Sequence, residues 1–425
     1  MESIGQILAG INLSQFIPKD RFMAVGIDTG KNKCGVSVVP ADITPDSPLE
    51  PSAMFYTENN REGFNIMLNR VLKEQERLNA RPVFVIEASN VYWKPIYWHL
   101  YKQGALIRTV NGVQTKRARG TGSRKNRDDL TDATAIATVF LMGNAHQTKF
   151  PEPLWADLRE LERMLIFLDK FTSGLKNRMR STLYQSFPEF ETVFPRNTMS
   201  SPTTLHLLEE GISDPKRIKE MSVDDLVLIL KKGSHGRIGY DKAVRLKELA
   251  ESSFGVPRGV EGRSKVLGFG AQVIRSIEHD IVKPLMCEIK GILDNIEEAR
   301  WLTTVDGVGT KTAAIFLGEL GNPEWFQRTN QVVAWFGWDP SSSRSSNYQR
   351  QINKISKAGS QYGRYGMFNC SLSWMLNCNP VRELYIALRK KGKTHDDATT
   401  VIAAKLTRIC WAIVRDRKPF DKNMI

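Results

Sequence analysis

Two apolar segments that each end in a carboxylate constrain the fold of this chain most strongly. Residues 22–28 (FMAVGID) are apolar up to Asp28, and residues 82–87 (PVFVIE) repeat the design and end at Glu87. Short apolar runs rich in valine, isoleucine and phenylalanine predict buried strands. Each strand therefore delivers one carboxylate to an end of a sheet.

Further strands and helices are expected around these two segments. Residues 35–39 and 53–56 alternate as the second and third strands of an antiparallel meander would, and residues 62–79 carry apolar side chains at helical spacing. An aromatic-rich helix is expected at residues 91–103 and another strand at 105–110. Residues 1–150 are thus predicted to form an α/β domain.

A second pair of acids opens the next predicted helix. Asp129 and Asp132 are three residues apart, so they share one helix face near its first turn, where negative charge is favoured. Alone, such a pair is typical of a solvated capping turn. Together with Asp28 and Glu87 it gives the carboxylate order of ribonuclease-H-like folds, which hold a pair of divalent ions for phosphoryl transfer. Asp128 stays an alternative to Asp129.

The segment just before this helix is strongly basic. Residues 111–127 contain six cations and no acid, and we expect a loop that contacts a phosphate backbone, with a solvated loop as the alternative. The cations are Lys116, Arg117, Arg119, Arg124, Lys125 and Arg127. The whole chain of 425 residues carries a formal charge of +14, which makes a polyanion the natural partner.

Composition excludes several other classes of protein. The five cysteines are scattered and form no CxxC pair, so neither a disulfide framework nor a zinc site is expected. The chain has no apolar run of about 18 to 20 residues and no signal-peptide pattern at its start. We therefore expect a cytoplasmic protein without a membrane partner.

The second half of the chain is expected to be all-α. Residues 153–183 and 273–296 carry apolar side chains every three or four positions, which predicts two long helices paired as an antiparallel coiled-coil stalk, with Pro284 bending the second. The stalk would occupy residues 151–300, with an inserted helical subdomain at about 187–269. Residues 301–425 would form a mostly helical C-terminal domain.

A glycine-rich turn opens that last domain. Residues 305–309 (VDGVG) precede a predicted helix, so the backbone amides around Gly307 and Gly309 are candidates for binding an anion. A simple turn between helices is an equal alternative. Farther on lie a serine-rich stretch at residues 341–346 and the cations Lys357 and Arg364.

At these segments the chain resembles the DEDD transposases of the IS110 insertion-sequence group, which includes Piv-type DNA invertases and bridge-RNA-guided recombinases. Residues 26–31 (GIDTGK), 86–88 (IEA) and 125–133 (KNRDDLTDA) are similar to the RuvC-like half of that family. Residues 305–309, 334–340 (AWFGWDP) and 355–359 (ISKAG) are similar to its C-terminal transposase half. The resemblance implies Mg²⁺ or Mn²⁺ held by Asp28, Glu87, Asp129 and Asp132.

The resemblance also implies a serine nucleophile. In the family this serine lies five residues after the proline of the first C-terminal motif and twelve before the lysine of the SK-x-G motif. Counting from Pro340 and from Lys357 leads to Ser345 both times. The family usually has glycine next, where this chain has Ser346, and Ser346 stays the alternative. Lys357 and Arg364 would hold the phosphate.

The implied function is a DNA recombinase that cuts and rejoins strands through a phosphoserine intermediate. A structured guide RNA would select donor and target DNA, and homodimers joined through the stalk would assemble into tetramers. One alternative is a metal-dependent junction-resolving endonuclease that needs only the first domain. Another is a nucleic-acid scaffold without catalysis, against which the four acids argue.

Overall fold

The computed structural model divides the chain into two compact units, Met1–Lys149 and Phe150–Ile425. It describes residues 21–41, 50–119, 128–145, 148, 150–194, 198–340, 343–345, 348–350 and 354–424. Each unit is taken by itself below. The further division expected at residue 300 stays a prediction.

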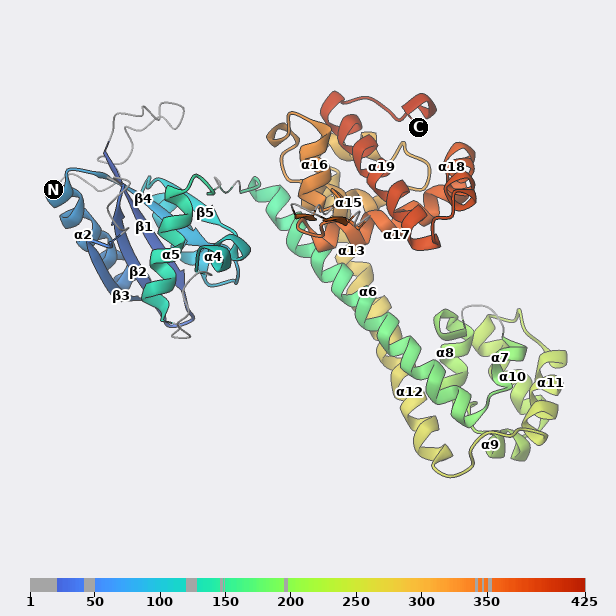
Figure 1. Cartoon of the computed structure of the whole chain (residues 1–425). Helices are drawn as coiled ribbons and strands as arrows, with labels where there is room; N and C mark the ends of the chain where they lie inside the picture. Colours follow the sequence, from blue (N-terminus) through green and yellow to red (C-terminus); the bar gives the residue numbers. More distant parts are fainter. Residues whose placement is uncertain are drawn as a thin grey trace. The chain divides into compact units, whose positions relative to one another are not determined.

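The first unit is built on a five-stranded sheet with the strand order β3-β2-β1-β4-β5 (Figure 1). The strands are β1 (Phe22–Thr29), β2 (Lys33–Pro40), β3 (Ala53–Glu58), β4 (Arg81–Glu87) and β5 (Ile107–Val110). β1, β2 and β3 form an antiparallel meander, whereas β4 runs parallel to both β1 and β5. This mixed order is the ribonuclease-H-like arrangement, and it confirms the predicted α/β fold.

Helices cover both faces of this sheet. Alternate residues of a strand point to opposite faces, so β1 divides its side chains between two cores. Met23, Val25 and Ile27 pack with α2 (Arg61–Leu78) and α3 (Trp93–Lys102), whereas Ala24 packs with α5 (Asp129–Leu141). The face that packs against α5 is the one that matters for the candidate site.

The loop expected at residues 111–127 is wrong in its first half, because Gly112–Arg119 forms the helix α4. Thr115 is fully buried, and Ala118 packs against the core cluster that contains Ile136 of α5. Glutamine, lysine, arginine and alanine all favour helix, and the contact with α5 supplies the packing energy that a short isolated helix lacks. Residues 120–127, with Arg124, Lys125 and Arg127, lie outside the described residues.

The second unit contains the predicted helix pair. α6 (Pro153–Ser186) lies alongside α12 (Val260–Ser276) and α13 (Lys283–Leu293), and the two arms run in opposite directions (Figure 1). Between α12 and α13 the residues Ile277–Val282 form a π-helical segment. Pro284 lies two residues after this segment, and its ring would clash with the carbonyl four residues earlier in a regular helix. The disturbance expected at Pro284 therefore includes a local widening of the helix.

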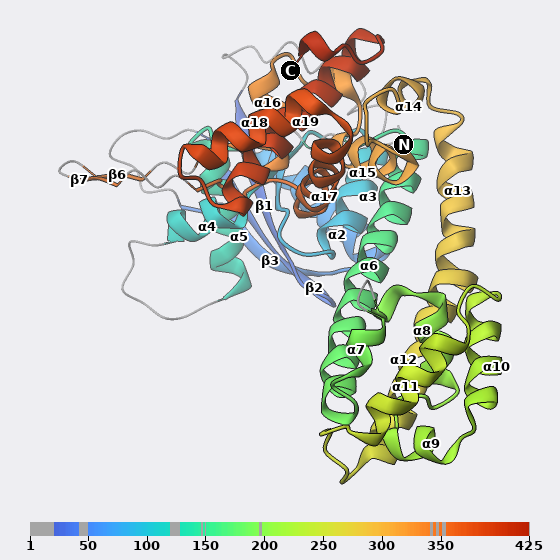
Figure 2. The ribbon, with the colours of Figure 1, turned by 90° about the vertical axis from the view of Figure 1, so that its right-hand side faces the viewer.

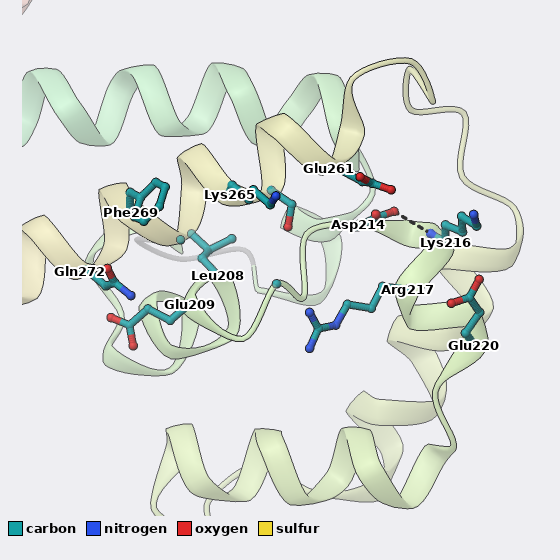
Figure 3. A pocket seen from close by; sticks show the side chains of 13 residues that line it. Leu208, Glu209, Asp214, Lys216, Arg217, Glu220, Glu261, Lys265, Phe269 and Gln272 are labelled. Atoms are coloured by element: carbon teal, nitrogen blue, oxygen red, sulfur yellow. Dashed lines mark hydrogen bonds between the residues drawn. The ribbon is translucent and has the colours of Figure 1, made fainter.

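A group of short helices with its own core lies at the far end of this pair (Figure 2). They are α7 (Phe190–Val193), η1 (Thr198–Ser200), α8 (Pro202–Glu209), α9 (Pro215–Glu220), α10 (Val223–Ser234) and α11 (Tyr240–Glu251). A cavity of about 480 Å³ between α8, α9 and α12 is lined by side chains of both charges, including Glu209, Arg217 and Lys265 (Figure 3).

The C-terminal helices pack around the end of the helix pair where α6 begins and α13 ends. They are α14 (Glu297–Leu302), α15 (Thr310–Leu320), η3 (Pro323–Trp325), α16 (Thr329–Phe336), α17 (Gln361–Asn377), α18 (Asn379–Lys390), α19 (His395–Asp416) and η4 (Lys422–Met424). Two short antiparallel strands, β6 (Ser343–Ser345) and β7 (Tyr348–Arg350), interrupt them. Phe316, Trp374 and Trp411 share one core with Leu158 of α6 and Ile289 of α13. Among the described residues, every helix is too short or too polar to cross a lipid bilayer.

Candidate active site

Asp28 and Glu87 lie near the ends of neighbouring parallel strands, on the same face of the sheet. Ile27 lies beside Ile86 in the β1–β4 register, so the next residue along each strand is an acid. Both isoleucines are buried in the core with α2 and α3. By alternation, the two carboxylates belong to the opposite face, at a strand spacing of about 4.8 Å.

Two glycines let α5 lie directly on that face. A methyl group on Gly26 would lie 2.0 Å from the carbonyl oxygen of Ala133, and one on Gly35 would lie 2.5 Å from that of Asp129. Gly35 is the partner of Asp28 across the β1–β2 ladder. The N-terminus of α5 therefore rests on the strand position next to Asp28, which brings Asp129 there. No residue larger than glycine fits at either contact.

The pKa of the Cys34 thiol also reflects the closeness of Asp28 and Asp129. Burial raises the pKa of Cys34 to about 11, and the negative charges of Asp28 and Asp129 both add to this rise. Asp132 lies one turn farther along α5, half-buried. Within the described parts of the chain, no three His, Cys, Asp or Glu side chains are close enough together to hold a metal ion. The carboxylates share one end of the sheet without forming a closed set of ligands.

The chemistry of these donors nevertheless suits a divalent cation. Carboxylate oxygens are the hard ligands that Mg²⁺ and Mn²⁺ prefer, and all four of these candidate ligands are carboxylates. The residues that could hold such an ion are Asp28, Glu87, Asp129 and Asp132. Their positions as ligands stay a prediction.

Asp128, the alternative to Asp129, is engaged elsewhere. The hydroxyl of Tyr56 on β3 donates a hydrogen bond of 2.5 Å to Asp128 Oδ1, and this bond raises the pKa of Tyr56 to about 12. The ammonium of Lys33 lies 4.0 Å from the centre of the Tyr56 ring. Asp128 is exposed at the edge of the sheet, whereas the backbone of Asp129 contacts the sheet itself.

The first turn of α4 lies over Glu87. A methyl group on Gly112 would be 2.9 Å from Glu87 Oε1, and Lys116 lines the same cavity as Glu87. Lys116 is exposed. Arg117 and Arg119 belong to α4, but their side chains are not among those described. One predicted phosphate-binding cation therefore stands beside the carboxylate group.

In the second unit, Ser345 is the last residue of β6 and lies opposite Tyr348 of β7. Ser346 lies outside the described residues. Pro340 and Ile355 pair at the base of this hairpin. The two segments that the sequence singled out, residues 334–340 and 355–359, thus come together where the hairpin begins.

Several contacts hold these two segments together. Ser356 donates hydrogen bonds to Asp339, from its amide to the carbonyl oxygen at 2.7 Å and from its hydroxyl to Oδ1 at 2.5 Å. A methyl group on Gly359 would lie 2.1 Å from the carbonyl oxygen of Trp335, so only glycine allows this approach. The base of the serine hairpin is therefore closely packed.

The two cations predicted to bind phosphate here differ in their surroundings. Arg364 Nη1 donates to the carbonyl oxygens of Phe336 and Gly359, at 2.9 and 2.8 Å, so the guanidinium also braces the two segments. Lys357 is exposed and has a φ of +56°, in the left-handed region that favours glycine. Lys357 therefore has a backbone conformation that is unusual for lysine, next to the close contact between Gly359 and Trp335.

The two glycines of the turn at residues 305–309 also differ. Gly307 has a φ of +84°, and a methyl group there would lie 3.1 Å from the backbone of Ser373 and Trp374 in α17. Gly309 precedes α15 and a methyl group there would meet open space. Packing therefore explains Gly307, and anion binding at Gly309 stays a prediction.

Sequence reasoning missed a buried polar group between α6 and α15. Arg163 Nε of α6 donates to Glu319 Oε1 of α15 at 2.6 Å, and the Ser360 hydroxyl donates to Glu319 Oε2 at 2.7 Å. Burial and the adjoining Glu319 raise the pKa of Glu162 to about 10. The sequence did contain a signal for this burial. Glu162 lies between Leu158 and Leu165 on the apolar stripe of its helix, and a charged residue at such a position is expected to be buried.

Comparisons with known proteins agree with this two-part organisation. Residues 25–188 match the DEDD transposase domain of the IS110 type, and residues 299–387 match the domain described as "Transposase IS116/IS110/IS902 family". The ribonuclease-H-like unit and these two domains define a DNA transposase. The chain belongs to the IS110/IS116/IS902 family of insertion-sequence transposases.

Individual relatives cover different parts of the chain. An insertion element IS110 protein of 43.6 kDa from Streptomyces coelicolor is 26% identical over 334 residues, which are 76% of this chain and 78% of the relative. An insertion element IS116 protein from Streptomyces clavuligerus is 23% identical over 93% of this chain and 95% of its own length. The pilin gene-inverting protein of Moraxella bovis is 26% identical over 30% of this chain and 39% of its own length.

Among solved structures, RuvC of Thermus thermophilus is 17% identical and covers 29% of this chain and 99% of its own, with a TM-score of 0.24. The same protein in complex with a Holliday junction substrate has a TM-score of 0.22. The assignment of the fold therefore depends on the strand order and on the family domains.

Proposed function

We propose that this transposase cuts and rejoins DNA strands with a divalent metal ion held by Asp28, Glu87, Asp129 and Asp132, and with Ser345 as nucleophile. The observation that carries the proposal is the placement of Asp28 and Glu87 on adjacent parallel strands, with the N-terminus of α5 lying next to Asp28. A group of carboxylates at this point can hold a divalent ion for phosphoryl transfer.

The carboxylates would hold a divalent ion next to the scissile phosphate, because the acids and the phosphate are both negatively charged and would otherwise repel each other. A divalent ion bound there, Mg²⁺ or Mn²⁺, would neutralise the phosphate and favour both the attacking and the leaving oxygen. Lys116, in the cavity beside Glu87, would contribute a further positive charge to the DNA backbone. The other cations of the basic segment are proposed to extend this contact along the nucleic acid: Arg117, Arg119, Arg124, Lys125 and Arg127.

The serine would form the covalent intermediate. Attack by Ser345 Oγ on phosphorus forms a serine phosphoester and releases one DNA hydroxyl, and the reverse attack by another DNA end restores the strand. A serine hydroxyl is a weak nucleophile until a base takes its proton or a bound metal ion lowers its pKa. Lys357 is proposed to hold the phosphate near Ser345, with Arg364 as a second cation and Gly309 as a backbone donor.

A homodimer that assembles into a tetramer is proposed to bring these parts together. Met164, Phe167 and Phe171 form an exposed apolar stripe on α6, and the two phenylalanine rings stack with centroids 6.4 Å apart. Their spacing of three and four residues is that of a coiled-coil seam. A protomer carrying Phe167→Glu and Phe171→Glu is expected to run as a monomer in light scattering, and an unchanged mass would exclude this seam.

A structured guide RNA is the proposed second partner beside donor and target DNA. The support is the family membership together with the formal charge of +14, which favours polyanionic partners. Sequencing of the RNA that co-purifies with the native protein tests this. Recovery of one structured RNA encoded beside the gene is expected, and recovery of only bulk cellular RNA would remove the guide from the proposal.

The carboxylates are tested by single neutral substitutions. Asp28→Asn, Glu87→Gln, Asp129→Asn and Asp132→Asn are each expected to abolish metal-dependent cleavage and to leave DNA binding intact. Asp128→Asn is the matched control, because Asp128 bonds to Tyr56 at the edge of the sheet. Full cleavage by the Asp129 variant with loss in the Asp128 variant would show that the register is wrong by one residue.

The serine is tested by trapping the adduct on a nicked DNA substrate and mapping it by mass spectrometry. Ser345→Ala is expected to form no protein–DNA adduct, whereas Ser346→Ala retains it. An adduct in the Ser345 variant would transfer the role to another serine. Normal cleavage without any adduct would favour the alternative function, a RuvC-like metal-dependent junction endonuclease.

A further inference from the structure

Helix α3 of the first unit has an outward face of large aromatic side chains. Ile96, Tyr97 and Leu100 are buried, whereas Trp98 and Tyr101 keep 47% and 57% of their surfaces exposed. The Trp98 and Tyr101 rings stack with centroids 5.4 Å apart and planes 18° from parallel. Aromatic rings of this size normally bury most of their surface, so exposed parallel rings point to a partner.

The charge around this face identifies the kind of partner. Residues 88–127 contain nine lysines and arginines and no acid. Lys94 and Lys102 belong to α3, one turn before and one turn after Trp98, and the Lys102 ammonium lies 5.7 Å from the centre of the Trp98 ring. Stacked aromatic rings between cations match the stacking platforms and backbone contacts that bind single-stranded nucleic acid.

The loop before α3 connects this helix to the strand ends that carry Asp28 and Glu87. The loop before α3 follows Glu87 at the end of β4, and Asn90 Nδ2 in this loop donates a hydrogen bond of 3.1 Å to the carbonyl oxygen of Thr29, next to Asp28. A helix of ten residues extends about 15 Å. The N-terminus of α3 is thus tied to the strand ends that carry the acids, whereas α3 itself packs on the sheet face opposite to them. A strand bound at the acids would pass over this end of the sheet to reach Trp98 and Tyr101.

We propose that the outward face of α3, formed by Trp98, Tyr101, Lys94 and Lys102, stacks on unpaired bases of a DNA strand that is bound at the carboxylates. The choice of DNA rests on the proposed function, since the carboxylates would act on a DNA phosphate. Strand exchange requires bases to leave their duplex, and a stacking platform across the end of the sheet from the cut would hold them.

The test measures binding of the full-length protein to a fluorescent oligothymidylate by anisotropy, with EDTA present. Binding under these conditions needs neither metal nor serine, so it succeeds or fails independently of the proposed catalysis. Trp98→Ala and Tyr101→Ala are each expected to weaken binding about 5- to 100-fold, whereas Trp98→Phe retains most of the affinity. Lys102→Gln is expected to reduce the salt dependence by about 0.7 in logarithmic slope.

The matched control is Tyr240→Ala, because Tyr240 is 59% exposed on α11 of the other unit and is not flanked by this basic segment. It is expected to bind like the native protein, and all variants are expected to keep the native melting temperature. Unchanged affinity of the α3 variants would overturn the proposal. So would an equal loss on duplex DNA, a loss confined to an oligouridylate of equal length, or a change of oligomeric state without a change in binding.

Discussion

The buried carboxyl of Glu162 offers the sharpest quantitative test of the structure. Its side chain is fully buried on α6, where burial and the adjoining Glu319 raise its pKa from 4.5 to about 10. Glu319 itself is buried, but hydrogen bonds from Arg163 hold its pKa below the usual value. At neutral pH, Glu162 therefore carries a proton and Glu319 a negative charge.

This difference makes stability depend on pH in a defined direction. The folded chain keeps a proton on Glu162 that the unfolded chain releases above pH 4.5, so stability falls as pH rises from about 4.5 towards 10. The slope is at most about 1.4 kcal/mol per pH unit. By pH 7 the cost reaches about 3 kcal/mol, because neutrality is some 2.5 units above the ordinary pKa.

Glu162→Gln removes this dependence, because glutamine has the same shape and cannot ionise. The variant is expected to match the native protein near about pH 4.5 and to exceed it by up to about 3 kcal/mol near neutrality, with a growing difference in mild alkali. Urea unfolding followed by tryptophan fluorescence measures this. Of the nine tryptophans, only Trp93 and Trp98 precede residue 150, so the signal reports mainly on the second unit.

Glu160→Gln is the control, because Glu160 is exposed on the same helix. It is expected to change stability by less than about 0.5 kcal/mol at every pH. A Glu162 variant that is less stable than the native protein at all pH values would refute the reasoning. It would mean that Glu162 is ionised and paired with the neighbouring arginines.

Three other changes test the remaining parts of the structure. Gly26→Ala is expected to push α5 from the sheet, lowering stability by about 1–3 kcal/mol in thermal unfolding and abolishing cleavage, so an active and stable variant would contradict the close contact. Lys357→Gly is expected to lower activity without lowering the melting temperature, since glycine accepts the φ of +56°, whereas Lys357→Ala lowers both. Glutamine at Lys116, Arg117 and Arg119 together is expected to reduce the logarithmic salt slope of duplex binding by about 2.7, with sequence choice unchanged; an unaltered slope would return α4 to a solvated surface.

The sequence by itself determined the elements whose signals are local. Apolar runs that end at Asp28 and Glu87 predicted two strands and the carboxylates at their ends. A buried strand can be predicted in this way because its residues are consecutive and nearly all apolar. The apolar spacing of residues 153–183 predicted α6 in the same way. The family's spacing, counted from Pro340 and Lys357, led to Ser345, which is the last residue of β6. Its role as nucleophile stays a prediction.

Only the tertiary structure decided which distant residues meet. It separated Asp128, bonded to Tyr56, from Asp129 on the sheet, and it engaged Arg364 with the carbonyl oxygens of two segments. It also converted part of the expected basic loop into α4 and buried Glu162. The physical reason is common to these cases, since packing against a remote element provides the energy that decides a short helix, a glycine contact or a proton's position, and no local pattern records it.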